Sequence, residues 1–473
     1  MSTSNHLTKS DFLLYLDAPL HLWAAKHDRI ETSPSPFNVH LMDQGYEVEQ
    51  LAKQYILSVL INPLNEETLH WQSTYSYQNY TVRTDALVEK PHEGSFDLYE
   101  IKSGTGVQKE NILDAVFQYL ILSKQLNMDK IFILHLNKDY VRDGDLDIPQ
   151  LFTADDITQD VLEKSAEVEA ALPLAWAAAQ SETMGTIPHC LKPNTCPCPS
   201  LCHPDLPDNS IYNIPRLSVK KKMQLLEQGI LMIQDIPIDF ELSDIQRQIV
   251  DVVCSNTEFI DADGIRQEFQ DFEFPLYFLD YESCLTAVPL YYGYHPQQQM
   301  VFQYSLHKMK SPDDDLIHSD YLADTKGDPS ASLVRHLRDD IGDTGTIFVW
   351  NKSFEMTRHK ELAVIHPEYA QFLTDLNERV YDLGEFVSKG LYLHPNFKGS
   401  WSIKNILPVM VPDLSYENLE VNKGDQAAVV WWDMITGNLS PEEVESTKTA
   451  LLTYCEMDTW AMVRIWQKLR EYC

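Results

Sequence analysis

Apolar and polar residues alternate along two neighbouring stretches in the first quarter of the chain. Residues 80–90 are rich in β-branched and aromatic side chains, and residues 96–101 place apolar side chains at Phe96, Leu98 and Ile101. Both patterns predict β-strands. The sequence Pro-His-Glu-Gly at residues 91–94 indicates a turn between them. We therefore expect an antiparallel hairpin.

The register of this hairpin decides where its charged residues face. If His92 and Glu93 form the loop, Asp85 lies directly opposite Glu100, and Lys102 lies two residues further along on the same face. A slip of one residue would turn the two carboxylates to opposite faces. Opposed carboxylates repel each other, whereas a bound Mg²⁺ would convert that repulsion into ligation.

A helical apolar pattern follows at residues 111–126 and places Asp114 and Gln118 on one face of the predicted helix. Taken singly, the hairpin and the helix are ordinary surface elements. Their combination in this order favours a functional site.

A second α/β pattern begins with a buried apolar strand at residues 272–283, where Asp280 and Glu282 share one face. Two acids on one face of a buried strand are costly unless a metal ion or protons compensate them. This strand end is therefore a second candidate site.

Two later segments carry polar residues that complete the second pattern. Residues 349–362 predict a strand that leads into a helix, with Asn351 and Glu355 near the junction. Residues 453–466 predict a helix with Tyr454 and Asp458 on one face.

The 473 residues are too many for one compact core, so we expect several domains. A Pro-rich segment after residue 196 predicts the main boundary. The expected division is an α/β domain at 1–205, a mostly helical connector at 206–271, and a second α/β domain at 272–473.

Composition narrows the class of protein. No apolar run approaches the roughly 20 residues of a membrane span, and the N-terminus lacks the apolar core of a secretory signal. We therefore expect a soluble cytoplasmic protein that does not act at a membrane. The formal charge of −34 argues against a broad cationic DNA-coating surface, but metal ions and a few basic residues can still hold a nucleic-acid substrate.

Four of the eight cysteines crowd into one short segment: Cys190, Cys196, Cys198 and Cys202. Such crowding in a cytosolic chain favours a metal site over disulfides. The other four cysteines carry no spacing signal.

The first constellation resembles the RecB-like branch of the PD-(D/E)XK nucleases. The resemblance implies a restriction-endonuclease-like fold in which Asp85 and Glu100 hold a divalent metal and Lys102 orients or activates the attacking water. It also implies that Gln118 supports the site and that Glu47 is an upstream acidic ligand. His40 is a second candidate with a structural role.

Some RecB-like nucleases carry an iron–sulfur cluster on one N-terminal cysteine and three cysteines after the nuclease core. Cys190, Cys196 and Cys202 resemble the distal trio. Ala18 stands where the family would show the N-terminal cysteine, and we expect no residue before Cys190 to replace it. Cys198 is then a fourth ligand. A [4Fe–4S] cluster and a structural Zn²⁺ both fit four thiolates, and a metal-free cluster is the remaining alternative.

The second constellation resembles the RNase H-like, DnaQ-type 3′–5′ exonucleases. The resemblance implies that Asp280, Glu282 and Asp458 hold two divalent ions, roughly 4 Å apart in such sites, and that Tyr454 aligns the attacking water. Glu355 stands where the family usually has Asp, and Asp382 is the alternative acid.

Residues 293–307 and 397–408 also resemble an uncharacterised bacterial domain family that follows a RecB-like nuclease in the same chain. In the second stretch, Ser400, Ser402 and Lys404 are candidate phosphate contacts or a capped helix start.

The sequence thus predicts a protein with two nuclease domains that hydrolyses phosphodiester bonds with Mg²⁺ or Mn²⁺. We expect DNA ahead of RNA as substrate, single-stranded or at ends, in repair or defence. The alternatives are a non-catalytic scaffold that retains both folds, a protein with one active site only, and an RNA-processing enzyme.

Overall fold

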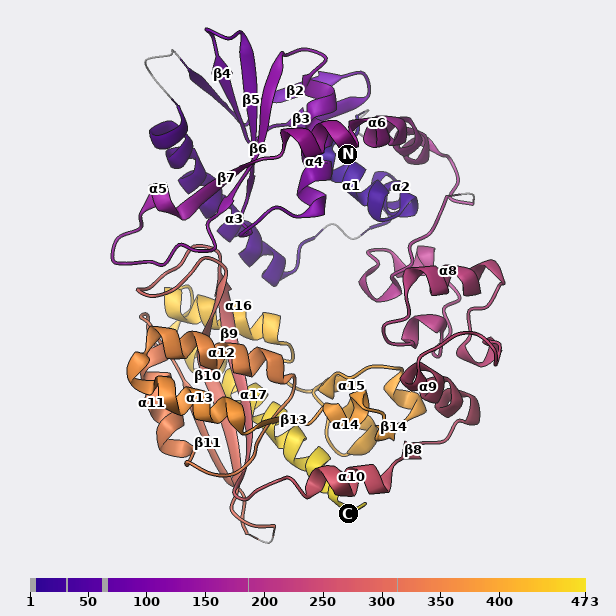
Figure 1. The fold of residues 1–473 in the computed structure, drawn as a ribbon, viewed down its shortest axis with the longest axis vertical. Coiled ribbons are helices and arrows are strands. Elements are labelled where there is room, and N and C mark those ends of the chain that lie inside the picture. The colour runs from indigo at the N-terminus through magenta and orange to yellow at the C-terminus, as the bar shows by residue number, and fades with distance from the viewer. Residues whose placement is uncertain (1–5, 31–32, 62–66, 186, 313) are drawn as a thin grey trace. The chain divides into compact units, whose positions relative to one another are not determined.

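A computed structural model describes residues 6–30, 33–61, 67–185, 187–312 and 314–473 (Figure 1). The fold is mixed α/β and divides into two compact units. The first contains Met1–Asp205 and Thr286–Gln298, and the second contains Leu206–Leu285 and Gln299–Cys473. Residues 206–271 therefore group with the second unit, and one loop of the second α/β pattern groups with the first.

The first unit is built on a five-stranded sheet in the order β1-β4-β5-β6-β7. Strands β5 and β6 are parallel, and the other neighbours are antiparallel. A separate hairpin joins β2 and β3. The strands are β1 (Thr68–Trp71), β2 (Thr74–Tyr77), β3 (Tyr80–Arg83), β4 (Ala86–Lys90), β5 (Ser95–Lys102), β6 (Met128–Leu136) and β7 (Phe152–Asp156).

Helices cover both faces of this sheet, and Figure 1 shows α3 and α4 on either side of β5. Leu98 of β5 packs with Phe12 and Phe117, whereas its neighbour Tyr99 packs in the cluster of Val48. This follows from the alternation of side chains along a strand. The helices are α1 (Lys9–Asp17), α2 (Pro19–Lys26), α3 (Pro36–Tyr55), α4 (Lys109–Leu122), α5 (Ile148–Leu151), α6 (Thr158–Gln180) and α7 (Pro199–Cys202).

The second unit has a mixed five-stranded sheet in the order β11-β10-β9-β12-β13. Strand β12 runs parallel to both β9 and β13, and β10 is antiparallel to β11. Strand β9, the first of these five strands along the chain, is thus central. The strands are β9 (Leu276–Thr286), β10 (Gln298–Met309), β11 (Ile317–Leu322), β12 (Ile347–Val349) and β13 (Val380–Asp382), with a small sheet of β8 (Phe259–Ile260) and β14 (Tyr392–Leu393).

The two faces of the second sheet bury different side chains. Tyr277 and Leu279 of β9 pack with Leu333 of α11, Leu362 of α12 and Leu373 of α13. Phe302 of β10 stacks on Trp431 of α16 at 4.3 Å on the other face, where Phe278 meets Trp466 of α17.

The helices of this unit are α8 (Val219–Glu227), α9 (Asp244–Ser255), α10 (Ala262–Phe269), α11 (Ser330–Asp340), α12 (Lys352–Ile365), α13 (Ala370–Glu378), α14 (Glu385–Ser388), α15 (Ile403–Met410), α16 (Gly424–Thr436) and α17 (Pro441–Arg470). Across the described part of the chain, no helix combines the length and apolar character that a bilayer crossing requires.

Candidate functional site

The hairpin of the first unit has the register that the sequence predicts. Ala86 pairs with Tyr99 and Lys90 pairs with Ser95, so Asp85, one residue before β4, lies opposite Glu100. The loop has four residues, 91–94, where we expected two. The observed four-residue loop and the expected two-residue loop have the same midpoint, between His92 and Glu93, so the register of the strands is the same in both. Gly94 closes the loop at φ +63°, a conformation that glycine adopts without steric cost.

Glu100 is the centre of a polar cluster between β5 and the helices α1 and α4. Its carboxylate is 1 % exposed. Lys9 Nζ and Lys102 Nζ each donate to Oε1 at 2.7 Å, and Gln118 Nε2 donates to Oε2 at 2.6 Å. Lys102 Nζ also donates to Asp114 Oδ2 at 2.7 Å. The structure thus brings the predicted Glu100, Lys102, Asp114 and Gln118 together.

The charges of this cluster are unevenly compensated. Burial opposes ionisation of Glu100, but the charges of Lys102 and Lys9 outweigh it and lower its pKa. Burial and the charge of Glu100 instead raise the pKa of Asp85 to about 8, although its Oδ2 accepts a hydrogen bond from the Ile101 N–H at 2.9 Å. Burial lowers the pKa of Lys102, but the negative charges of Glu100 and Asp114 raise it by more, so the net shift is upward. The raised pKa favours the cationic form of Lys102 at neutral pH, and its predicted role with the attacking water stays a prediction.

Two predicted residues of this site remain untested, and one residue was not foreseen. Glu47 is exposed on α3, and among the described residues no hydrogen bond or ion pair joins it to Asp85 or Glu100. Its role as a metal ligand stays a prediction, and so does the structural role of His40, whose Nε2 lies 2.9 Å from Gln44 Nε2. Lys9 was missed because it is separated from Glu100 by 91 residues and no local pattern marks it.

The predicted site residues of the second unit lie near the boundary between β9 and β12. At this boundary the order of the strands along the chain reverses, with β10 and β11 on one side and β12 and β13 on the other. Strand β12 pairs with β9 only as far as Phe348 and Phe278, so Asp280 lies just beyond the paired segment. Parallel strands on either side of such a switch leave a crevice at their carboxyl ends. Asn351 follows β12 at φ +78° and begins α12, which carries Glu355 in its first turn.

One cavity of about 210 Å³ collects the predicted residues of the second unit. Its polar lining includes Asp280, Glu282, Asn351, Glu355, Lys404, Tyr454 and Asp458. The side chains come from β9, α12, α15 and α17. Among the described residues, four carboxylates and one lysine therefore face the same small space.

Burial and mutual repulsion make these carboxylates hard to ionise. Burial and the charges of Asp458, Glu282 and Glu355 raise the pKa of Asp280 well above its usual value, and burial with Asp458 does the same to Glu282. Burial raises the pKa of Glu355 to about 8 and that of Asp458 to about 6. A bound cation would remove this cost.

The structure distinguishes between the candidate acids and phosphate contacts. The carboxylate of Asp382 accepts hydrogen bonds from the Asn351, Lys352 and Gly384 N–H groups at 3.0–3.2 Å, and it is not part of the cavity lining. Glu355 is the acid in the cavity. Lys404 lines the cavity as expected, whereas Ser400 and Ser402 do not. Instead, Ser400 Oγ accepts a hydrogen bond from the Ser402 N–H.

Two further residues at this site were not foreseen. Tyr416 OH donates to Asp458 Oδ1 at 2.7 Å. Cys455, which carried no spacing signal, is fully buried with its Sγ 3.7 Å from Asp280 Oδ2. The sequence does place Cys455 directly after Tyr454 on the predicted helix, and this proximity to Tyr454 and Asp458 is the feature that could have pointed to it.

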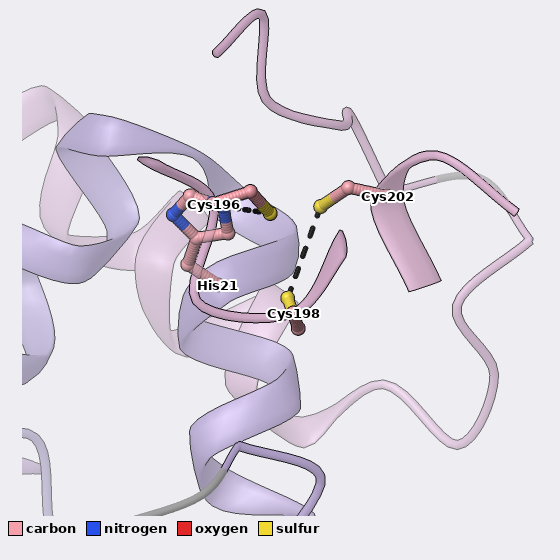
Figure 2. Close-up of side chains that lie close together, drawn as sticks. All are labelled: His21, Cys196, Cys198 and Cys202. Atoms are coloured by element: carbon pink, nitrogen blue, oxygen red, sulfur yellow. Dashed lines mark hydrogen bonds between the residues drawn. The ribbon is translucent and has the colours of Figure 1, made fainter. Parts of the chain in front are cut away.

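The cysteine segment forms a compact group with a histidine from α2. Figure 2 shows His21 beside Cys196, with Cys198 and Cys202 close by, and one donor atom of each lies within 4.8 Å of the others. Cys196 Sγ is 3.3 Å from His21 Nε2, and the Sγ atoms of Cys198 and Cys202 are 3.8 Å apart. The cluster is thus able to hold a metal ion.

His21 corrects the expectation that no residue before Cys190 would take the place of the missing N-terminal cysteine. It lies three positions after Ala18, on the first turn of α2. Its Nδ1 is 2.8 Å from Asp17 Oδ2, so its Nε2 is directed to the sulfurs. Cys190 instead groups with Cys196 and His203, and its Sγ lies 3.2 Å from His203 Nε2.

Comparison with known proteins gives partial matches. A family model described as a domain of unknown function (DUF2779) matches residues 277–402. That segment contains Asp280, Glu282 and Glu355 but ends before Tyr454 and Asp458. No solved structure matches.

Two curated relatives cover part of the chain. The uncharacterised protein UU173 of Ureaplasma parvum serovar 3 is 29% identical over 133 residues, which are 25% of this chain and 19% of the relative. The uncharacterised MG366 homolog of Mycoplasma pneumoniae is 28% identical over 205 residues, which are 40% of this chain and 31% of the relative. The chain thus spans less than a third of the length of these relatives.

Proposed function

We propose that the second unit is a divalent-metal-dependent exonuclease that hydrolyses phosphodiester bonds at strand ends, with DNA ahead of RNA as substrate. One observation carries the proposal: Asp280, Glu282, Glu355 and Asp458 converge on a single cavity from three separate elements. The central position of β9 and the parallel β12 are compatible with an RNase H-like fold.

The residues of the cavity fit divalent cations. Carboxylate oxygens are the ligands that Mg²⁺ and Mn²⁺ prefer. Among the described residues, Glu355 Oε2 is buried without a hydrogen-bond partner, as a ligand atom awaiting a cation would be. When bound, such ions would lower the pKa of water and shield the negative charge of the phosphate.

The other side chains of the cavity position these acids and the substrate. Tyr416 holds Asp458 in one orientation through its 2.7 Å hydrogen bond. Lys404 Nζ donates to Tyr454 OH at 3.1 Å, and the Tyr454 hydroxyl in turn has Asp458 within hydrogen-bond reach. Burial and the nearby carboxylates raise the pKa of Tyr454, which keeps its hydroxyl proton in place at neutral pH. Tyr454 can therefore orient a water molecule, and Lys404 can balance phosphate charge.

Action at strand ends rests on the resemblance of the cavity residues to the DnaQ-type 3′–5′ exonucleases. The cavity volume of about 210 Å³ does not discriminate between paired and unpaired strands, because both expose their phosphates on the outside.

For the first unit we propose a RecB-like nuclease site at Asp85, Glu100 and Lys102, supported by Gln118. One observation favours a protein in which only the second site is active: Lys9 and Lys102 already neutralise Glu100 and Asp114. The need for a divalent cation is correspondingly smaller than in the second unit.

For the cysteine cluster we propose a single Zn²⁺ held by His21, Cys196, Cys198 and Cys202. With Zn–S bonds of about 2.3 Å, a tetrahedral site places its sulfurs about 3.8 Å apart. The Cys198–Cys202 separation is 3.8 Å. In a [4Fe–4S] cluster each thiolate binds a different iron, which requires wider spacing. The ion would fasten α2 to the end of the first unit.

The test is cleavage of 3′-labelled single-stranded DNA and matched RNA by the full chain with Mn²⁺. We expect stepwise shortening of the DNA, abolished in Asp280→Ala and retained in the surface control Glu378→Ala. The decrease in cleavage rate in Asp85→Ala measures how much of the total activity comes from the first site. An inactive wild-type protein that still binds the oligonucleotide would replace the proposal with the scaffold alternative, and undiminished cleavage by Asp280→Ala combined with Asp85→Ala would refute both sites.

A further inference from the structure

A second histidine-containing cluster lies on the sheet of the second unit, outside the carboxylate cavity. His307 of β10 and His318 of β11 are directly opposed across the antiparallel pair, with ring centroids 4.6 Å apart. Glu456 comes from α17. One donor atom of each of the three residues lies within 4.8 Å of the others.

Hydroxyl groups fix one nitrogen of each imidazole ring. His307 Nδ1 is 2.8 Å from Thr459 Oγ1, and His318 Nε2 is 2.9 Å from Ser305 Oγ. The two hydroxyls are themselves 2.8 Å apart. Such bonds to the outer nitrogen hold the ring of a metal-binding histidine in one orientation.

The second nitrogen of each ring, His307 Nε2 and His318 Nδ1, makes no hydrogen bond among the described residues. His307 is 5 % exposed. His318 Nδ1 lies 3.8 Å from Glu456 Oε1 and 3.9 Å from Asp320 Oδ2.

We propose that His307, His318 and Glu456 form a transition-metal site that takes Zn²⁺. Two imidazole nitrogens and one carboxylate are a common ligand set for this ion, with the fourth position filled by water or a further carboxylate. Bonds of about 2.1 Å place tetrahedral ligand atoms about 3.4 Å apart. The 3.8 Å between His318 and Glu456 therefore needs only a small movement of Glu456, whose side chain is 51 % exposed.

The site has a structural consequence that goes beyond the proposed nuclease activity. Glu456 lies on α17 between Tyr454 and Asp458, which face the carboxylate cavity. A Zn²⁺ held between Glu456 and the β10–β11 pair would fasten this helix to the sheet. The ion would fix the helix position on which the geometry of the cavity depends.

The experiment measures Zn²⁺ binding to the full chain after chelation, by calorimetry and metal analysis, with excess Mg²⁺ present to occupy carboxylate sites. We expect His318→Gln and Glu456→Gln each to weaken one Zn²⁺ equivalent by at least about 100-fold, since loss of a direct ligand exceeds the 10–100-fold cost of losing an outer partner. Glu442→Gln, at an exposed position in the first turn of α17, is the matched control and should bind as the wild type does.

Co²⁺ substitution separates this site from the cysteine cluster. Thiolate ligands give Co²⁺ an intense ultraviolet charge-transfer band, which a site of nitrogen and oxygen ligands lacks. We expect both variants to keep that band while losing one equivalent of metal. Equal Zn²⁺ stoichiometry and affinity in the wild type and both variants would overturn the assignment, whatever the nuclease activity of the protein.

Discussion

The clearest prediction concerns Glu355, because its buried environment predicts that the stability of the protein depends measurably on pH. The carboxyl group is 2 % exposed, and burial raises its pKa from 4.5 to about 8. Between these pH values the folded protein keeps a proton on Glu355 that the unfolded chain releases. Folding therefore becomes less favourable as the pH rises through this window, by about 1.4 kcal/mol per pH unit.

The full difference between the two states follows from the same numbers. About 3.5 pH units correspond to about 5 kcal/mol of lost stability at pH 8. Glu355→Gln keeps the shape of the side chain and removes the titration. In the absence of divalent metal, we expect the variant to lose less stability than the wild type between pH 5 and pH 8, by up to about 4 kcal/mol for these three pH units.

Urea unfolding followed by tryptophan fluorescence suits this comparison, since six of the nine tryptophans lie in the second unit. The quantity to compare is the change in unfolding free energy between pH 5 and pH 8, because any constant effect of the amide then cancels. Glu378→Gln, an exposed position on α13, is the control and should follow the wild type. Parallel pH profiles for the wild type and Glu355→Gln would refute the reasoning. Mn²⁺ should stabilise the wild type most at pH 8.

Three further outcomes are expected. Lys9→Gln should bind Mn²⁺ more tightly at the first site in calorimetry, because the substitution removes a cation 2.7 Å from Glu100. The control Lys26→Gln loses a similar bond to Asp11 and should bind Mn²⁺ as the wild type does. Tyr454→Phe should lower kcat about 100-fold with little change in KM if Tyr454 orients the water, and an equal effect on KM would contradict that role. His21→Ala should lose the metal of the cysteine cluster while His21→Cys retains it, as measured by metal analysis, and full occupancy in His21→Ala would exclude His21 as a ligand.

Local sequence patterns were sufficient for the elements that carry the sites. The turn at residues 91–94 determined the register of the β4–β5 hairpin, whereas residues 80–83, expected on the same strand as 86–90, form β3 and pair with β2 instead. Spacing of four residues placed Tyr454 and Asp458 on the same face of a helix, and both line the cavity. The crowding of cysteines before residue 203 likewise indicated a metal site.

The tertiary structure decided which distant residues join these elements. Lys9 meets Glu100 across 91 residues, and His21 meets Cys196 across 175. The tertiary structure also places Glu355, and not Asp382, in the lining of the carboxylate cavity. The carboxylate of Asp382 instead accepts hydrogen bonds from the backbone at the start of α12. Periodicity reports the face on which a side chain lies, because that depends only on its near neighbours along the chain. Which other element packs against that face depends on the packing of the whole core, and no local pattern contains that information.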